Sequence, residues 1–344
     1  MNAGRLSCVI KVTLPQRLQL RPSWDAARAF PARRLARIPP SAIFKDMRGD
    51  VERALQLIQS NESSSVEQAL GLLQNTVLSF SMKVCGHPQD AEDTMQDVLF
   101  KSLPYLPKFT NAQALGVWLY KVARNRCLMN RRGSKFSPKV NLSLDELMPD
   151  GRELRELLRS DGPSPESEVL KGESAERLHH AILKVPPQYR FVLVLHDMEG
   201  LSTTEVAKVT GLREGTVRVR LHRARLFVRK ELARLGKNGR QPRPSKRSGD
   251  EMTKPKHCRE LFAALSDYMD GLVDDAVCAE MGKHLRGCAP CEAFLASLEN
   301  VVKQCRSYNP PCTPENAANV RERLLQQYES ARLALTEKTR PAAN

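Results

Sequence analysis

Residues 200–230 contain two short helical patterns separated by a glycine, and they limit the possible folds more than any other part of the chain. Ser202 and Glu205 have the spacing of a capping box, in which each side chain accepts a hydrogen bond from the backbone N–H of the other residue. Gly211 can adopt the left-handed conformation that ends a helix. The sequence therefore predicts a short helix after Ser202 and a second helix that opens at Glu214.

The second helix carries one apolar stripe with polar and basic residues on both sides. The stripe consists of Val217, Leu221, Ala224 and Val228. One flank holds Arg218, His222, Arg225 and Arg229, and the other holds Thr216, Arg220 and Arg223. This arrangement is typical of a helix-turn-helix, whose second helix fits the major groove of duplex DNA. The alternative is an ordinary helical hairpin with a basic face.

The positive charge of the chain is concentrated around this second helix. The net charge is +15 over 344 residues. Between Arg213 and Arg247, 13 lysines and arginines stand against two acids, Glu214 and Glu231. Such a block predicts a polyanionic partner, and nucleic acid before any other. The sequence has no run of about eighteen apolar residues, so we expect no transmembrane helix.

Long segments rich in Leu, Ala, Glu, Arg and Gln favour helices, and we expect an all-α chain of separate helical domains joined by flexible linkers. The proline- and arginine-rich start has the composition of a transit peptide, but we favour a disordered extension or a start codon assigned too early. The expected parts are an extension at 1–46, a helical domain at 47–133, an acidic linker at 134–175, the helix-turn-helix domain at 176–236, a basic linker at 237–255 and a last domain at 256–337.

Residues 183–232 resemble region 4 of the extracytoplasmic-function sigma factors of bacterial RNA polymerase. The resemblance rests on the turn from Pro187 to Arg190, the approach at 199–202, the triplet at 215–217 and the sequence HRAR at 222–225. In that family this domain reads the −35 promoter element. The resemblance assigns the role to Thr204, Glu205, Arg213, Thr216, Arg218, Arg220 and Arg223.

Residues 91–103 resemble the helix with which the same family binds polymerase. The resemblance implies that four residues of this helix bind a coiled coil on the largest polymerase subunit: Asp93, Gln96, Asp97 and Phe100. Taken alone, the segment is equally typical of an exposed acidic helix face. The right order of this segment and the helix-turn-helix, with an acidic linker between them, strengthens the assignment.

Residues 114–132 resemble the family's region 2 helix that melts and holds the −10 element. The resemblance places Trp118 and Leu119 in the core. Basic grooves bind single-stranded DNA well. The resemblance directs four side chains toward that single strand, namely Arg124, Asn125, Arg131 and Arg132. Met129 stands where the family often has Asp, and Leu115 replaces a frequent aromatic residue. The Met129 difference bears on −10 sequence preference and leaves the assignment in place.

Nine cysteines without a signal peptide favour metal or redox use over a disulfide framework. His284, Cys288 and Cys291 have the spacing His-x3-Cys-x2-Cys, which is typical of metal ligands. A closed tetrahedral zinc site needs a fourth ligand, for which we choose Cys258 and keep His257 and Cys278 as alternatives. Three sulfurs and one nitrogen leave no open position, so we expect one zinc ion with no catalytic role.

The pattern of these four ligands resembles the zinc-binding anti-sigma domain, which in other proteins sequesters sigma factors of this class. The resemblance implies a zinc staple or a redox sensor, and the sequence leaves both open. The prediction is a non-enzymatic sigma factor of the bacterial cytoplasm that binds core RNA polymerase and promoter DNA. Its own zinc domain would fold back on regions 2 and 4. The alternatives are a helix-turn-helix regulator that never joins polymerase and a zinc hydrolase with a nucleic-acid-binding arm.

Overall fold

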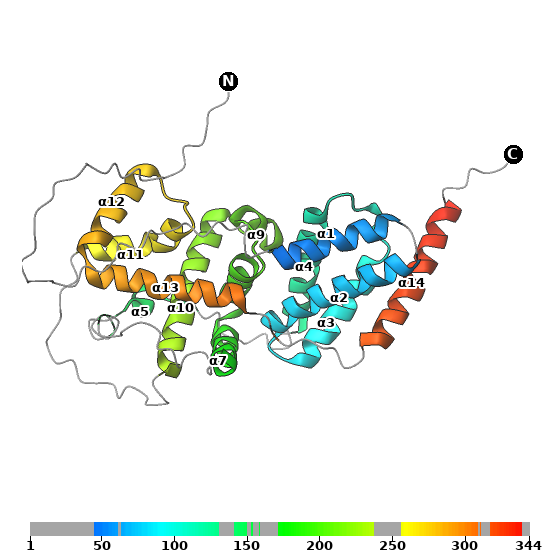
Figure 1. Ribbon diagram of the computed structural model, residues 1–344, viewed down its shortest axis with the longest axis horizontal. Coiled ribbons are helices and arrows are strands. Elements are labelled where there is room, and N and C mark those ends of the chain that lie inside the picture. Colours follow the sequence, from blue (N-terminus) through cyan, green and yellow to red (C-terminus); the bar gives the residue numbers. More distant parts are fainter. Residues whose placement is uncertain are drawn as a thin grey trace, which may run out of the picture.

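The computed structural model describes residues 45–60, 63–130, 141–149, 153, 158, 171–236, 256–308, 310 and 317–338. Every regular element in these ranges is a helix, which confirms the predicted all-α class (Figure 1). The expected basic linker at 237–255 and nearly all of the expected extension at 1–46 lie outside these ranges. None of the helices described is both long and apolar enough to cross a bilayer.

Four helices form an N-terminal bundle: α1 (Lys45–Ser60), α2 (Ser63–Cys85), α3 (Pro88–Ser102) and α4 (Ala112–Asn130), with the 3-10 turn η1 (Leu106–Lys108) before α4. Leu70, Leu73, Val77 and Phe80 recur at helical spacing on α2 and are all buried. Gly86, at a φ of 87°, and Pro88, at the start of α3, turn the chain sharply between α2 and α3. The bundle therefore has one apolar core around α2.

The middle block consists of α7 (Lys171–Lys184), α8 (Pro187–Leu193), the π-helical turn η4 (Val194–Met198), α9 (Thr203–Thr210) and α10 (Glu214–Gly236). Helix α10 packs against α7, α8 and α9. The short helix α5 (Leu144–Leu147), inside the expected acidic linker, also contacts α10. Leu142 and Leu147 are buried there. The segment around α5 is therefore anchored on the middle block by two leucines, although its composition predicted only a solvated linker.

The C-terminal helices are α11 (Lys256–Met269), α12 (Asp275–Gly287), α13 (Ala289–Ser307) and α14 (Ala317–Lys338). Helices α11 and α13 pack against α10, and α13 also packs against η4. Helix α14 lies instead against α2 and α3, at the other end of the molecule (Figure 1). Its buried residues Val320, Leu324 and Tyr328 are four residues apart and form one apolar stripe. The last predicted domain, 256–337, is therefore divided between two surfaces.

A buried polar seam joins the N-terminal bundle to the middle block. One carboxylate oxygen of Glu199 accepts a hydrogen bond from Lys83 Nζ at 2.9 Å, and the other accepts one from the Tyr120 hydroxyl at 2.8 Å. Lys83 and Glu199 are each 2% exposed. A buried charge is tolerated only when it is paired, so this seam fixes how the two blocks meet.

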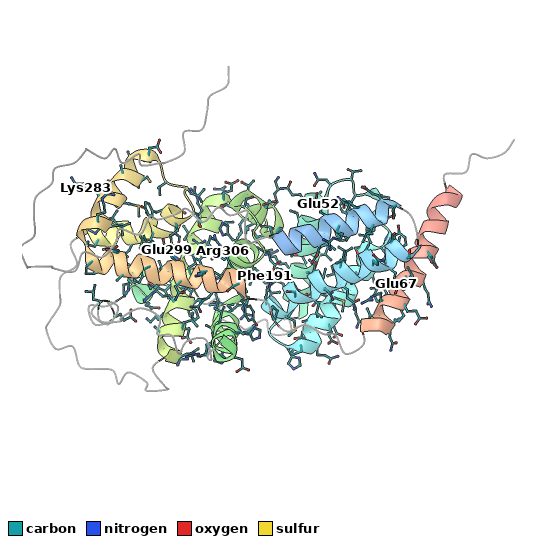
Figure 2. All side chains as sticks on the ribbon, viewed as in Figure 1. Glu52, Glu67, Phe191, Lys283, Glu299 and Arg306 are labelled. Carbon is teal, nitrogen blue, oxygen red and sulfur yellow. A yellow bond between two sulfur atoms is a disulfide. The ribbon has the colours of Figure 1, made fainter. Side chains whose placement is uncertain are left out.

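A second set of contacts extends the seam. Arg190 Nη1 donates a hydrogen bond to the backbone carbonyl of Val84 at 3.0 Å. The Arg124 guanidinium lies 5.7 Å from the ring centre of Phe191, which is labelled near the middle of the molecule in Figure 2. Both arginines thus contact a backbone oxygen or an aromatic face of the opposite block.

Replacing Lys83 with Met should lower the free energy of unfolding by about 3–5 kcal/mol, because Glu199 is left charged and buried without its cation. Thermal and urea unfolding of the full chain measure the loss. Lys121→Met, on the exposed face of α4, is the matched control and should cost less than about 0.5 kcal/mol. Equal stability of the two variants would show that the Lys83–Glu199 pair does not hold the seam.

Candidate nucleic-acid interface and metal centre

The helix-turn-helix forms as predicted. Ser202 Oγ accepts a hydrogen bond from the Glu205 backbone N–H, and the Glu205 carboxylate accepts one from the Ser202 N–H at 2.7 Å. Gly211 ends α9 in the left-handed conformation, at a φ of 72°. The stripe on α10 is buried, as predicted, at Val217, Leu221, Ala224 and Val228. Local capping and one apolar stripe therefore define this motif.

One flank of α10 keeps its side chains accessible. Thr216 is exposed, and Arg220 and Arg223 are half-buried. Arg213, in the turn before α10, and Thr204, on α9, are also exposed. Five of the seven residues predicted to read DNA therefore lie on the accessible side of the motif.

Helix α11 and the turn after it cover the opposite flank of α10. His222 Nδ1 lies 2.9 Å from Ser266 Oγ. Arg225 donates hydrogen bonds to both carboxylate oxygens of Asp270, from Nη1 at 2.8 Å and from Nη2 at 2.9 Å. The sequence predicted this flank to be a second basic face, but His222 and Arg225 are buried.

The same flank is covered at both of its ends. The Arg229 guanidinium lies 4.5 Å from the ring centre of Phe294 on α13 and pairs with Glu153 at 3.2 Å. Burial lowers the pKa of Arg229, and Glu153 opposes that change. At the other end, Arg218 acts electrostatically on Asp267 of α11: burial raises the pKa of Asp267, and Arg218 opposes the rise.

Arg225 is fully buried between two carboxylates. It donates to Asp197 from Nε at 2.8 Å and from Nη2 at 2.6 Å, in addition to its bonds with Asp270. Burial alone would raise the pKa of Asp197, but Arg225 and then His196 outweigh it and hold that pKa well below its usual range. Burial likewise disfavours the charged guanidinium, yet the two carboxylates raise the pKa of Arg225. The Asp197 carboxylate and the Arg225 guanidinium are therefore charged together.

His222 is held neutral by its surroundings. Burial, followed by the charges of Arg225 and Arg223, lowers the pKa of His222 to about 4. A neutral imidazole can exchange one hydrogen bond with Ser266 at no cost in buried charge. The contact between α10 and α11 is thus suited to neutral pH.

Glu205, one of the residues predicted to read DNA, is buried in this structure. Its carboxylate accepts hydrogen bonds from the backbone and hydroxyl of Ser202 and from the Gln113 side-chain amide of α4. A carboxylate that caps its own helix and bonds to a second block is not available to a base edge. Its assignment as a DNA contact stays a prediction for a state in which α9 and α4 have separated.

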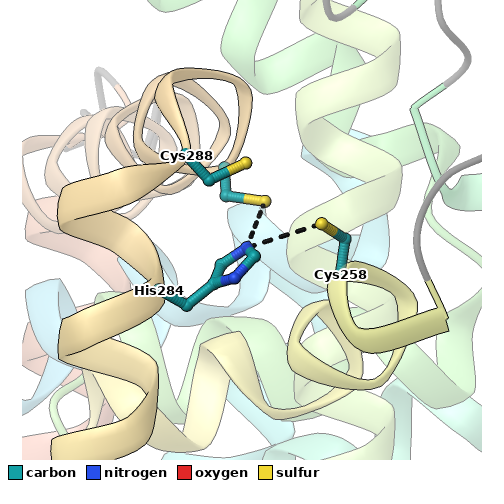
Figure 3. Close-up of side chains that lie close together, drawn as sticks. Cys258, His284 and Cys288 are labelled. Carbon is teal, nitrogen blue, oxygen red and sulfur yellow. Dashed lines mark hydrogen bonds between the residues drawn. The ribbon is translucent and has the colours of Figure 1, made fainter.

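Four side chains of the C-terminal block meet in one cluster. Cys258 lies on α11, His284 on α12, and Cys288 and Cys291 at the junction of α12 and α13 (Figure 3). Their ligand atoms all lie within 4.8 Å of one another. His284 Nε2 is 3.4 Å from Cys258 Sγ and 3.2 Å from Cys291 Sγ. The structure thus brings together the four predicted ligands, and Cys278, an alternative fourth ligand, lies outside the group.

The donor set of this cluster fits zinc. One imidazole nitrogen and three sulfurs match a closed, four-coordinate structural site. Burial raises the pKa of the Cys258 and Cys291 thiols, and Cys288 raises both further. A cation is what would keep such thiols ionised, because thiolates are the form that binds metal. Zinc would supply a fixed tetrahedral cross-link between α11 and the α12–α13 junction.

Family models match three separate segments of the chain. Sigma-70 region 2 matches residues 71–136, sigma-70 region 4 matches residues 175–228, and a zinc-finger family matches residues 258–291. The ECF RNA polymerase sigma factor SigW of Bacillus subtilis is 24% identical over 185 residues, which are 54% of this chain and 98% of that protein. The RNA polymerase sigma-H factor of Pseudomonas aeruginosa is 26% identical over 187 residues, covering 54% and 94%.

Both sigma regions are present in their expected order, and the alignments cover nearly the whole of both relatives. The chain belongs to the extracytoplasmic-function sigma factors. It carries in addition a zinc-finger segment of the anti-sigma type after region 4. The function of this sigma factor is promoter recognition, and a regulator that never joins polymerase is not favoured.

The predicted polymerase-binding residues of the sigma factor lie on α3. Asp93 is exposed, and Gln96, Asp97 and Phe100 are half-buried. Asp97 forms an ion pair with Arg126 of α4, which ties α3 to the helix predicted to hold the −10 element. The Arg323 guanidinium of α14 lies 5.6 Å from the ring centre of Phe100. Helix α14 therefore lies on part of the face predicted for polymerase.

The predicted −10 residues begin on α4. Asn125 is exposed, and Arg124 is half-buried against the middle block. Burial, and then the charge of Arg220 on α10, lowers the pKa of Arg124. Arg131 and Arg132 lie outside the described residues. Trp118 is half-buried and Leu119 is buried, as the resemblance implied.

Sequence reasoning missed the residues that join the sigma regions to the rest of the chain. No pattern pointed to Ser266 and Asp270, or to a disulfide between Cys85 and Cys127. One available signal was the position of Arg225 beside the apolar stripe of α10. An arginine on the edge of an apolar stripe is often paired when it is buried.

Replacing His284 with Ala, or Cys288 with Ser, should lower bound zinc from about one ion per chain to nearly none, because a closed tetrahedral site loses one of four ligands. Metal content after dialysis against a weak chelator measures the effect. Cys278→Ser is the matched control, since Cys278 lies in the same block but outside the cluster. Full zinc content in the His284 and Cys288 variants would refute this ligand set.

Proposed function

We propose that this sigma factor binds core RNA polymerase and promoter DNA through the residues assigned above, and that its own C-terminal helices restrain both in cis. The covered flank of α10 is the observation that carries the proposal. Arg218, His222, Arg225 and Arg229 all face groups of the C-terminal block or of the segment at Glu153. A restrained sigma factor of this kind would act in the bacterial cytoplasm.

The covered flank hinders DNA binding in two ways. A recognition helix must enter the major groove, and α11 and α13 pack along one side of α10. In addition, Asp267 and Asp270 neutralise charge that would otherwise attract phosphates. Only the flank with Thr216, Arg220 and Arg223 stays accessible, so region 4 can meet DNA fully only after α11 has moved.

Helix α14 supports the same proposal at region 2. Its apolar stripe is buried where it packs on α2 and α3, and Arg323 lies over the ring of Phe100. Phe100 is the aromatic anchor predicted for the polymerase coiled coil. The surface around Phe100 on α3 cannot contact α14 and a polymerase helix at the same time. Polymerase would therefore have to displace α14.

The seam between regions 2 and 4 also opposes promoter binding. The −10 and −35 elements are about 25 base pairs apart, or roughly 85 Å along B-DNA. In this structure Arg124 of region 2 contacts Phe191 of region 4. Arg220 of region 4 lies close enough for its charge to lower the pKa of Arg124. Two regions packed this closely cannot reach both elements, so the proposed active form has the seam open.

One zinc ion at the cluster is proposed to hold the restraining surface together. Cys258 lies at the start of α11, and Ser266 and Asp267 lie two turns later on the same helix. The three thiols and one imidazole leave no position for a substrate, so the proposed role of the ion is structural and not catalytic. Loss of the ion would free α11 to tilt away from α10.

The proposal predicts more transcription from a chain truncated after residue 245 than from the full chain, because both the zinc domain and α14 are removed. Run-off transcription with core polymerase measures it. Asp270→Asn should raise activity to a smaller extent, since Arg225 keeps Asp197 as a partner. Asp275→Asn, an exposed change on α12, is the control. Equal or lower transcription from the truncated chain would contradict the proposal that the C-terminal helices restrain the sigma factor in cis.

The contact between α10 and α11 should weaken as the pH falls. The pKa of His222 is lowered to about 4 in the folded chain, so unfolded or undocked His222 binds more protons between about pH 6.5 and 4. Its contribution is complete above pH 6.5 and is lost as the pH falls through that window. Thermal stability against pH measures this.

The control is His222→Gln, which keeps a hydrogen-bonding group near Ser266 but does not titrate. This variant should lose less stability between pH 6.5 and 4 than the unaltered chain does. Parallel pH profiles of the two chains would show that His222 is not held neutral by the contact.

A further inference from the structure

We propose that Cys85 and Cys127 form a reversible thiol–disulfide site, oxidised by hydroperoxides and reduced by small dithiols, that stiffens the face of region 2 on which region 4 docks. The two residues are joined by a disulfide in the structure, 42 residues apart in sequence. The site is separate from the zinc cluster, and it does not depend on restraint by the C-terminal helices.

The backbone is suited to this bond without rearrangement. The Cα atoms are 5.6 Å apart, which is the usual separation across a disulfide. Cys85 is the last residue of α2, and Cys127 lies near the end of α4. The bond therefore cross-links α2 and α4, which also pack together through the rings of Phe80 and Tyr120.

Thr94 of α3 makes the reduced form tolerable as well. Its hydroxyl lies 3.6 Å from Cys85 Sγ and 3.8 Å from Cys127 Sγ, and Thr94 is fully buried. In the dithiol form each thiol can exchange a hydrogen bond with this hydroxyl, so neither is left as an unpaired polar group. A pair that is stable in both states can cycle between them.

The cross-linked ends of α2 and α4 carry the contacts to region 4. Lys83 and Val84 directly precede Cys85, and both bond to the middle block. Tyr120 and Arg124 precede Cys127 by seven and three residues, which places them on one side of α4. Tyr120 bonds to Glu199 and Arg124 lies on Phe191. A bond between the two cysteines thus fixes both halves of the docking surface relative to each other.

Both sulfurs are buried, but Cys85 is 7% exposed against 2% for Cys127 and is followed by the exposed turn of Gly86 and His87, so the proposed oxidation begins at Cys85. The Cys85 sulfur attacks a hydroperoxide: an S–O bond forms, the O–O bond breaks, and an alcohol or water leaves. The Cys127 thiol then attacks the sulfenic acid, so that the S–S bond forms, the S–O bond breaks, and water leaves. The two sulfurs give up two electrons, which reduce the peroxide. A small dithiol reverses the bond by exchange.

The test uses the full, zinc-loaded chain, treated with hydrogen peroxide or with dithiothreitol. After thiols are blocked in acid, tryptic peptides 84–101 and 127–131 should be joined covalently in the oxidised sample and separate in the reduced one. Amide hydrogen exchange of residues 187–199 in region 4 should be slower in the oxidised chain. Zinc content is measured in the same samples.

Cys127→Ala is the key variant and Cys278→Ser is the control outside both the pair and the cluster. The difference in exchange should vanish in the Cys127 variant and persist in the Cys278 variant. Failure of the two peptides to join in the native chain would overturn the site. Joined peptides with unchanged exchange at 187–199 would overturn the coupling, as would a difference that follows zinc loss in the Cys127 variant. The comparison within the unaltered chain needs no variant to fold.

Discussion

The buried guanidinium of Arg225 is the interaction on which the arrangement of the C-terminal half depends. It is fully buried and is bonded to Asp197 of η4 and to Asp270, which directly follows α11. An arginine cannot lose its proton, so a buried one must be paired. Asp197 alone supplies one carboxylate, and Asp270 satisfies the remaining donors. Without Asp270, Arg225 would keep only its bonds to Asp197, so packing of the C-terminal helices on region 4 completes the hydrogen bonding of this buried guanidinium.

In the proposed function the same helix would serve two sets of partners. DNA phosphates would compete with the carboxylates of Asp267 and Asp270 on one flank of α10, while Arg220 and Arg223 on the other flank have no such competitor on α11 or α13 among the contacts described. Salt weakens the two sets unequally. Counterion release makes DNA binding fall steeply with salt, whereas an enclosed pair such as Arg225–Asp197 is screened little. Under the proposed restraint in cis, the balance between restraint and promoter binding would therefore be an electrostatic one, and polymerase binding at region 2 would shift it.

The features that sequence could predict are local ones. The capping box at Ser202, the turn at Gly211 and the stripe on α10 depend on residues within one or two helical turns, and all are present. The metal cluster was within reach because zinc demands a fixed donor set, and Cys258 was already preferred from the sequence, with His257 and Cys278 left open; the fold brings Cys258 to the cluster and leaves Cys278 outside it. The seam and the covered flank were out of reach, since Lys83 pairs with a residue 116 positions away and Arg225 with one 45 positions away. A single sequence shows no periodicity across such distances. The burial of the Glu205 carboxylate could not be predicted for the same reason. Its hydrogen-bond partner Gln113 lies 92 residues upstream.

The position of the cluster relative to the covered flank explains how a metal site could act on a DNA-binding helix that it does not touch. Cys258 and Ser266 are eight residues apart on one continuous helix, or about 12 Å along its axis. A helix transmits a change at one end to the other as a rigid rod when its middle is packed, and Phe262 and Leu265 are both buried between them. Phe262 meets Phe294 of α13 edge to face, with ring centres 4.8 Å apart. In the proposed function a metal ion bound at Cys258 would fix one end of α11, the aromatic pair would hold its middle, and the contact of Ser266 with His222 would hold the other end. Without the metal ion at Cys258 the aromatic pair alone would not fix the angle of α11, and the enclosure of Arg225 by Asp270 would lose its support.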